Sequence, residues 1–459
     1  MRVLVLADSD SYLKWAVTRA RELPSEWRVE VAVLANAVTP SARQRADAVA
    51  GRWVDVPVIS VAAAEERINA GLDVLLLACR GPLIEFLFEE VLGQMSQRPA
   101  VVAGIPGLWF PPTRRGLDFR ADVDLLVVHS RREREAVDAA NPSGGPQVAL
   151  AALIEGERPV RPHWHESEAD VSGSALAKVP THSQVQAHSP TRRHTLSDAS
   201  AAPAAPAATR GAGAIIFAPQ ALVPSTRAER VTLLDGLVRT AVENPSVPVL
   251  VKLRGEEGEA QTHSEFASYP ELARQLRVER PRNLRFVQGP LSEHLEGARG
   301  LVTVSSTAAL EAVGAAVPTM VLGDFGVSAL NLNEVFRGSG LWGDLDRLAR
   351  LDFPQVDTAW KHDNYFHEAH ESNWVDAVTC LAEDRALLES LRASRPHSKA
   401  PDGARGRIRR LRVRSQALGR SDERWRRWLT ALVLRPALAI RALLVRGDRP
   451  RRPSTKLPD

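Results

Sequence analysis

The feature that most constrains the fold is a strand–helix alternation that occurs twice along the chain. In residues 1–155, short runs rich in valine, leucine and alanine alternate with stretches whose apolar residues recur at helical spacing. Uniformly apolar runs of this kind suit strands that are buried on both faces of a parallel sheet. The runs of this first half are residues 3–6, 29–34, 74–77, 100–103, 125–128 and 148–153. The alternation predicts a doubly wound α/β sheet.

The same alternation resumes after a change in composition. Residues 156–213 are rich in alanine, proline, serine and histidine and have almost no periodic apolar pattern, so we predict a disordered linker there. Apolar runs then follow at residues 214–218, 247–253, 284–287, 301–304 and 319–322. The sequence therefore predicts two Rossmann-like domains, at 1–155 and 214–395, followed by a basic, partly amphipathic helical tail at 396–459.

Composition narrows the class of protein. The chain has 459 residues, of which 44% are hydrophobic and 25% charged, as expected for a globular protein with two full-sized cores. Its 2 cysteines cannot build a disulfide framework, and its N-terminus reads as a strand rather than a signal peptide, so we expect a cytoplasmic protein. No apolar run is long enough to span a bilayer. The linker histidines lack metal-ligand spacing, so no metal site is predicted.

The most informative stretch is residues 301–326, in which polar residues follow an apolar strand. Ser305, Ser306 and Thr307 stand at the carboxyl end of this strand, and Glu311 lies one turn into the helix predicted next. Ligands of open α/β sheets bind beyond the carboxyl ends of strands, where hydroxyls and N–H groups at a helix start can hold phosphate. Glu311 is a candidate acceptor for ribose hydroxyls. The alternative is that Ser306 or Thr307 only caps the helix.

Two further elements extend this candidate phosphate site. Lys252 and Arg254 end the strand at 247–253 and, being two residues apart, project from the same face. Paired cations at a strand end suit a diphosphate, although two exposed loop cations would show the same pattern. Gly326 closes a short loop after the strand at 319–322 that could wrap around a base or a sugar, or form an ordinary turn.

This order of motifs resembles the C-terminal half of GT-B glycosyltransferases. The similar groups are the capsule polysaccharide, Kdo, CDP-glycerol and polysialyl transferases, in which a K-L-H-P motif and an S-S/T…E motif line the nucleotide-sugar site. Lys252 matches the lysine of the first motif, whereas Arg254 stands where the histidine would be. Ser305, Ser306 and Glu311 match the second motif. The chain apart from the linker also resembles a family of bacterial glycosyltransferases. The resemblance implies two Rossmann-like domains that face each other across a cleft.

In such an arrangement the loops of the first domain face the acceptor. Asp8 and Asp10 follow the first strand and are candidates for the general base that activates an acceptor hydroxyl, and His129 is a candidate acid/base at another strand end. The alternatives are a helix cap formed by one aspartate and a structural hydrogen-bonding histidine. The loop that contains Gly104, Gly107 and Trp109 is suited to stacking on a sugar, or is a plain turn.

The tail carries most of the concentrated positive charge. Arginines crowd between Arg405 and Arg427, and tryptophan, leucine and arginine are interleaved over residues 425–446. Such a segment suits an amphipathic helix on an anionic membrane, here the inner face of the plasma membrane, or a helix that docks on the first domain. A solvated arginine-rich tail is the third interpretation.

The resemblance implies a glycosyltransferase with a nucleotide-sugar donor and a cell-envelope glycan or glycolipid acceptor. We expect it to need neither metal nor cofactor beyond this co-substrate, because the cations of the second domain would neutralise the leaving diphosphate. Nucleic acid is not expected as a partner. Two alternatives remain open, a transferase of polyol phosphate from a CDP carrier and a non-catalytic protein that binds a nucleotide or a polyanion.

Overall fold

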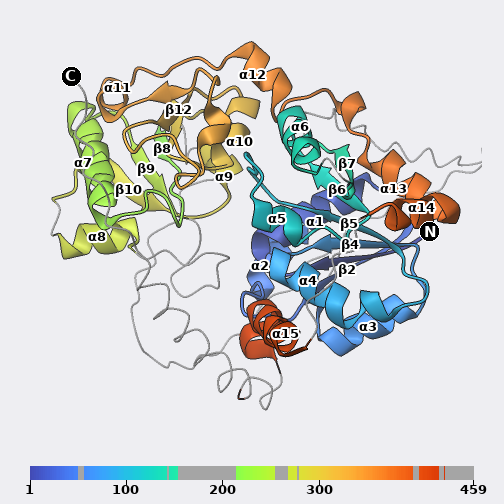
Figure 1. Cartoon of the computed structure of the whole chain (residues 1–459). Coiled ribbons are helices and arrows are strands. Elements are labelled where there is room, and N and C mark those ends of the chain that lie inside the picture. The colour runs from blue at the N-terminus through green and yellow to red at the C-terminus, as the bar shows by residue number, and fades with distance from the viewer. Residues whose placement is uncertain are drawn as a thin grey trace, which may run out of the picture.

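The computed structural model describes residues 1–49, 56–141, 144–153, 213–253, 267–276, 279–395 and 403–422, together with Trp428. The predicted linker except Gly213, the predicted phosphate ligand Arg254, and the segment 425–446 except Trp428 lie outside the described residues. Figure 1 shows two α/β domains side by side, the first in blue and cyan and the second in green and yellow.

The first domain contains a parallel sheet whose described part has seven strands in the order β3-β2-β1-β4-β5-β6-β7. The strands are β1 (Arg2–Ala7), β2 (Arg28–Leu34), β3 (Val58–Ile59), β4 (Val74–Ala78), β5 (Ala100–Gly104), β6 (Leu125–Val128) and β7 (Gln147–Leu150). The helices between them are α1 (Asp10–Glu22), α2 (Ala42–Val49), α3 (Val61–Asn69), α4 (Gly81–Glu90), α5 (Arg114–Asp118) and α6 (Arg131–Ala140), with a 3-10 turn η1 (Leu92–Gln94).

The apolar runs form this sheet because successive side chains of a strand enter two different cores. In β1, Val3 and Val5 belong to the core that α1 shares, whereas Leu4 and Leu6 belong to the core that α3 and α4 share. A strand covered on both faces has to be apolar at every position, which is why the sequence shows no alternation here.

The second domain repeats the design with a parallel sheet of six described strands in the order β10-β9-β8-β11-β12-β13. The strands are β8 (Ile215–Phe217), β9 (Val249–Lys252), β10 (Leu284–Val287), β11 (Gly300–Thr303), β12 (Thr319–Leu322) and β13 (Trp342–Gly343). Its helices are α7 (Arg227–Glu243), α8 (Tyr269–Gln275), α9 (Leu291–Leu295), α10 (Ala308–Gly314), α11 (Leu345–Ala349) and α12 (Thr358–Asp363), with 3-10 turns η3 (Glu334–Phe336) and η4 (Ala369–Glu371). Thr226 and Glu229 form a capping box that starts α7.

After α12 the chain returns to the first domain, as Figure 1 shows. Helices α13 (Trp374–Glu383) and α14 (Arg385–Ala393) bury Trp374, Val378 and Leu388 in the same core as β1 and α1. The indole N–H of Trp374 donates to Glu22 Oε2 at 2.6 Å. The segment that follows the second domain in sequence is therefore part of the first domain in space.

Part of the basic tail also lies on the first domain. Helix α15 (Gly403–Leu418), which a short 3-10 turn η5 (Gly419–Ser421) follows, packs against α4 and buries Val413 and Ala417 there. Its Arg409 pairs with Glu85 and Glu89 of α4. Helix α15 therefore lies on the first domain, whereas the docking interpretation concerns residues 425–446, which apart from Trp428 lie outside the described residues.

Candidate functional site

The two domains approach each other through the loops at the carboxyl ends of their strands. In each sheet the winding direction reverses at a central pair, β1 with β4 in the first sheet and β8 with β11 in the second, which is where open α/β sheets bind ligands. The loop after β5 reaches the second domain, where Leu108 and Phe110 pack against its core. A Cβ on Gly107, whose φ is 105°, would lie 3.0 Å from Thr307 Cγ2.

On the second domain, the predicted hydroxyl cluster follows β11 as expected, but its three members differ in environment. Ser305 is fully buried and its Oγ donates to the carbonyl of Leu332 at 2.6 Å, so it fastens the neighbouring loop. Ser306 Oγ accepts from the N–H of Ala308 at 3.2 Å, and Thr307, the N-cap residue of α10, makes no capping hydrogen bond with its side chain. Ser306 and Thr307 are half-buried at the domain interface.

Glu311 on α10 is where charges of both domains converge. Its side chain is exposed to solvent, yet protein from both domains surrounds it. The resulting desolvation raises the pKa of this carboxyl group, and the positive charges of Lys252 on β9 and Lys14 on α1 act in the opposite direction. Two predicted donor-site residues, Lys252 and Glu311, are therefore electrostatically coupled, and Lys14 joins them from the other domain.

The loop that ends at Gly326 is braced from within. Gly326 has a φ of 81°, and its carbonyl accepts hydrogen bonds from Asn331 at 3.0 Å and Asn333 at 3.1 Å. Asn331 also donates to the carbonyl of Phe325 at 2.6 Å. The amide groups of the two asparagines therefore fix the shape of this loop.

On the first domain, Asp8 lies in a closed network at the end of β1. Its Oδ2 accepts from Nε of Arg80 at 2.8 Å and from the backbone N–H of Arg80 at 3.0 Å. Arg80 also donates to Asn36 Oδ1 at 2.9 Å, and Asn36 donates to the carbonyl of Asp8 at 2.6 Å. Asp8 is fully buried, and burial raises the pKa of its carboxyl group while the Arg80 charge opposes that rise. Sequence reasoning missed Asn36 and the role of Arg80, since three strand ends had to be brought together to reveal them.

Asp10 is placed differently. It begins α1, forms a 2.9 Å ion pair with Lys14 one turn later, and keeps 28% of its side chain exposed. Lys14 thus connects Asp10 to the charged group around Glu311.

His129 and its loop are held inside the first domain. The ring is buried, Nε2 accepts from Trp15 at 2.7 Å and Nδ1 donates to the carbonyl of Ala151 at 2.8 Å. Burial, with Arg19 nearby, lowers the pKa of His129 to about 3. Both ring nitrogens therefore form hydrogen bonds within the protein, as expected for a histidine with a structural role.

The remaining loop residues also contact protein. A Cβ on Gly104 would lie 2.3 Å from the ring of Trp15, so this glycine makes room for the indole. The Trp109 ring lies beside Gly116, and its backbone N–H donates to Glu133 Oε1 at 3.0 Å. Glu133, buried on α6, also accepts a 2.5 Å hydrogen bond from Tyr365 of the returning segment. Burial raises the pKa of this carboxyl group, and the hydrogen bond from Tyr365 lowers it. No sequence pattern indicates that Glu133 joins the two domains.

Two general properties bear on the chemistry. Among the described residues, no group of three or more histidine, cysteine, aspartate or glutamate side chains could hold a metal ion. Within the same ranges, none of the helices combines the length and the apolar character needed to cross a bilayer.

Sequence and structure likenesses to known proteins are of two kinds, remote resemblances to solved structures and an extensive family match. None of the curated proteins matches the sequence significantly. Solved structures with a similar course of the chain include a UDP-N-acetylglucosamine 2-epimerase homologue from Listeria monocytogenes, with 12% identity over 86% of this chain and 98% of that one and a TM-score of 0.47. Another is the UDP-GlcNAc 2-epimerase of Neisseria meningitidis, with 10% identity, 85% and 100% coverage and a TM-score of 0.46. A third is the spinosyn forosaminyltransferase, with 16% identity, 86% and 99% coverage and a TM-score of 0.36.

These likenesses are remote, and no residue role is drawn from them. The family match is extensive, since residues 3–381 fit the sequence pattern of a family described as "Putative glycosyltransferase (DUF6716)". This span begins in β1 and ends in α13, so it covers both domains and the return of the chain to the first one. The protein belongs to this glycosyltransferase family, and its described residues form two Rossmann-like α/β domains.

Proposed function

We propose that the protein transfers a sugar from a nucleotide-sugar donor to a glycan or glycolipid acceptor of the cell envelope without a divalent metal. The observation that supports this proposal is that the positive charges of Lys252 in the second domain and Lys14 in the first both act on Glu311 of α10. A donor in this position would lie against the second domain and present its sugar to the first.

The roles follow from the chemistry of each group. Lys252 would neutralise the diphosphate as the bond between the sugar and the phosphate breaks, with Arg254, two residues further along the chain, as a second cation. The half-buried Ser306 and Thr307 would donate hydroxyls to phosphate, and Glu311 would accept from the ribose. Gly326 would border the base or the sugar.

Of the two aspartates, we favour Asp10 as the general base. Its side chain is partly exposed, whereas Asp8 is enclosed and bound to Arg80. Asp8 would act as a positioning residue that holds the loop after β1 in place. Replacing Asp10 with asparagine should then lower kcat by roughly a hundredfold while KM for the donor changes little, because the variant loses proton abstraction and keeps the donor site.

The first test is the binding of nucleotides. UDP, GDP, CDP and CMP are titrated into the wild type, Lys252→Ala and the matched variant Lys361→Ala. Lys361 lies on α12, and its Nζ is 5.2 Å from the centre of the Phe366 ring. One nucleotide should raise the Tm of the wild type and of Lys361→Ala, with about 2.7 kcal/mol of stabilisation at a hundredfold excess over Kd. Lys252→Ala should lose this response. If no nucleotide at millimolar concentration changes the Tm of the wild type, the nucleotide-sugar proposal fails.

Turnover separates the transferase from its alternatives. The sugar-linked form of the nucleotide that binds is incubated with cell-envelope glycolipid, and release of nucleotide is measured with and without acceptor. Acceptor-dependent release supports the transferase. Binding without turnover would favour the non-catalytic alternative, and no contact in the described residues favours the CDP-dependent one, because His129 is buried and hydrogen bonded at both ring nitrogens.

The acceptor class is supported by exposed arginines of α15. Arg407, Arg410 and Arg412 are exposed, while Arg409 and Arg414 pair with carboxylates of the first domain. These exposed arginines would place the enzyme on the anionic inner leaflet of the plasma membrane, where glycolipid acceptors are found. Co-sedimentation with phosphatidylglycerol vesicles should fall on replacing these three exposed arginines with glutamine and should weaken with salt. Equal binding of the triple variant would refute the membrane contact.

A further inference from the structure

A cavity with three arginines in its wall lies at the amino edge of the first sheet, away from the domain interface. It measures about 250 Å³ and lies among the segments that lead into β5, β6 and β7 and the end of α14. Arg98 stands just before β5 and residues 144–146 just before β7, so the cavity is at the amino edge of the sheet. The loops of the candidate active site follow the carboxyl ends of the same strands. We call this space the arginine cavity, after Arg98, Arg392 and Arg395 in its wall.

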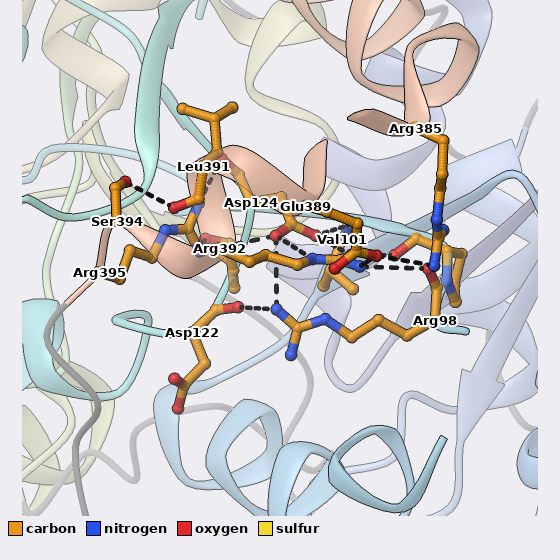
Figure 2. Close-up of polar contacts among 12 residues, drawn as sticks. Arg98, Val101, Asp122, Asp124, Arg385, Glu389, Leu391, Arg392, Ser394 and Arg395 are labelled. Atoms are coloured by element: carbon orange, nitrogen blue, oxygen red, sulfur yellow. Dashed lines mark hydrogen bonds and ion pairs between the residues drawn. The ribbon is translucent and has the colours of Figure 1, made fainter. Parts of the chain in front are cut away.

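The three guanidinium groups converge on one buried carboxylate, as Figure 2 shows. Asp124 lies 2.7 Å from Arg392 Nη2, 3.4 Å from Arg98 Nη2 and 3.6 Å from Arg395 Nη1. Its Oδ2 also accepts a hydrogen bond from the backbone N–H of Val101 at 2.8 Å. The Asp124 carboxylate therefore divides its hydrogen bonds between this N–H and the arginines. Arginines from the first domain and from the returning helix are thus held together by a single negative charge.

The other charges near the arginine cavity do not balance the cations. Arg385 and Arg392 both pair with the more exposed Glu389, and Asp122 lines the cavity. The group therefore contains four guanidinium groups and three carboxylates, which leaves one positive charge in excess. Its members are Arg98, Arg385, Arg392, Arg395, Asp122, Asp124 and Glu389. Burial lowers the pKa of Arg98 and of Arg395, with Asp124 opposing and the neighbouring arginines reinforcing the effect. A partly buried excess cation is costly unless an anion accompanies it.

The hydrogen bonds of the arginines also indicate that an anion is lacking. Within the described ranges, the buried Nε atoms of Arg98 and Arg395 have no acceptor. Arg395 keeps only 9% of its side chain exposed, and its two terminal nitrogens already donate to the carbonyls of Val123 and Asp124. A buried N–H on a cation without an acceptor costs free energy. A bound oxyanion would recover this free energy when the guanidinium groups turn toward the arginine cavity.

We propose that the arginine cavity binds a small molecule that carries a phosphate group. Arg98 and Arg395 belong to different segments, and a tetrahedral oxyanion between them can accept from both. The volume exceeds that of a bare phosphate, and the apolar side chains of Leu117 and Leu126 in the wall provide contacts for an organic part. Because Arg98 lies in the first domain and Arg395 follows α14, the ligand stabilises the docked position of α14.

The probe is inorganic phosphate, added at constant ionic strength with chloride as the reference. Its Kd is measured by calorimetry on the wild type, Arg98→Gln, Arg395→Gln and the matched Arg114→Gln, whose arginine is 83% exposed on α5. Each of the first two variants should weaken phosphate binding at least about tenfold, and Arg114→Gln should leave it unchanged. Lys252→Ala should also leave it unchanged, since that lysine lies on the other domain.

Three outcomes overturn the proposal. The first is that the wild type binds phosphate no better than chloride. The second is that Arg98→Gln and Arg395→Gln bind phosphate as tightly as the wild type. The third is loss of binding in Lys252→Ala alone, which would place the phosphate between the domains instead. Circular dichroism confirms the fold of each variant, and if Arg395→Gln does not fold, Arg98→Gln decides, since its contact with Asp124 is long at 3.4 Å.

Discussion

Trp15 and His129 are joined across the first domain by a 2.7 Å hydrogen bond from the indole N–H to Nε2. Since Nδ1 donates to the carbonyl of Ala151, the imidazole is neutral and has one defined tautomer. Gly104 leaves the space in which the indole lies. His129 thus connects helix α1 to the segment that follows β7, and Gly104 at the end of β5 lies against the same indole.

This histidine should make stability depend on pH. Its pKa in the folded protein is lowered to about 3, so the unfolded chain binds the proton more tightly. The contribution of His129 is complete above about pH 6.5 and is lost as the pH falls from there toward 3, with a slope of up to about 1.4 kcal/mol per pH unit. We expect the Tm of the wild type to fall more steeply over this window than that of His129→Gln in scanning calorimetry. Parallel curves would contradict this assignment.

Arg80 should be required for the stability of the first domain. Replacing it with alanine leaves the fully buried Asp8 without its cation, which costs about 2 to 3 kcal/mol after allowance for the partial exposure of Arg80. Asp8→Asn, which removes the charge together with the pair, should cost less. The comparison is made by denaturant unfolding, with the exposed Arg67→Ala, whose partner is Glu30, as the control. An equal loss in Arg80→Ala and Arg67→Ala would show that the buried pair has no special role.

Glu311 should determine how kcat/KM for the donor falls at low pH. Because the pKa of its carboxyl group is raised, the carboxylate needed to bind a ribose is lost at a higher pH than for an ordinary glutamate. Glu311→Gln should raise KM for the donor about tenfold and flatten this fall of kcat/KM. Glu296→Gln, at an exposed position on the same domain, is the matched variant. An unchanged pH profile in Glu311→Gln would remove Glu311 from the donor site.

Gly107 should be sensitive to a single methyl group. Alanine there combines a left-handed backbone conformation with a contact at 3.0 Å to Thr307. Gly338 has a comparable φ of 80° with no atom within 4 Å of an added Cβ, so Gly338→Ala isolates the backbone effect. Both variants should lose about 1 kcal/mol in stability, and only Gly107→Ala should also lose kcat/KM, because the two domains can no longer approach as closely. Similar kcat/KM values for the two variants would argue against a functional domain contact.

Sequence patterns predicted the strands better than the site. Fully buried strands such as β4 are apolar throughout and stand out in the sequence, whereas β3 and β13, each 2 residues long, were not anticipated. The pairs that shape the site cannot be inferred from spacing, because Asp8 and Arg80 are 72 residues apart and Glu133 and Tyr365 are 232 apart. The assignment of Lys252 and Glu311 to the donor site follows from a general rule about strand ends and stays a prediction.

The return of α13 and α14 to the first sheet also affects synthesis of the chain. The face of β1 that Trp374, Val378 and Leu388 cover is made first and stays open to solvent until these residues leave the ribosome. By then the second domain has been synthesised and can fold by its own contacts. The first domain therefore begins folding early and finishes last, and a nascent chain arrested before residue 374 should present an apolar surface to chaperones.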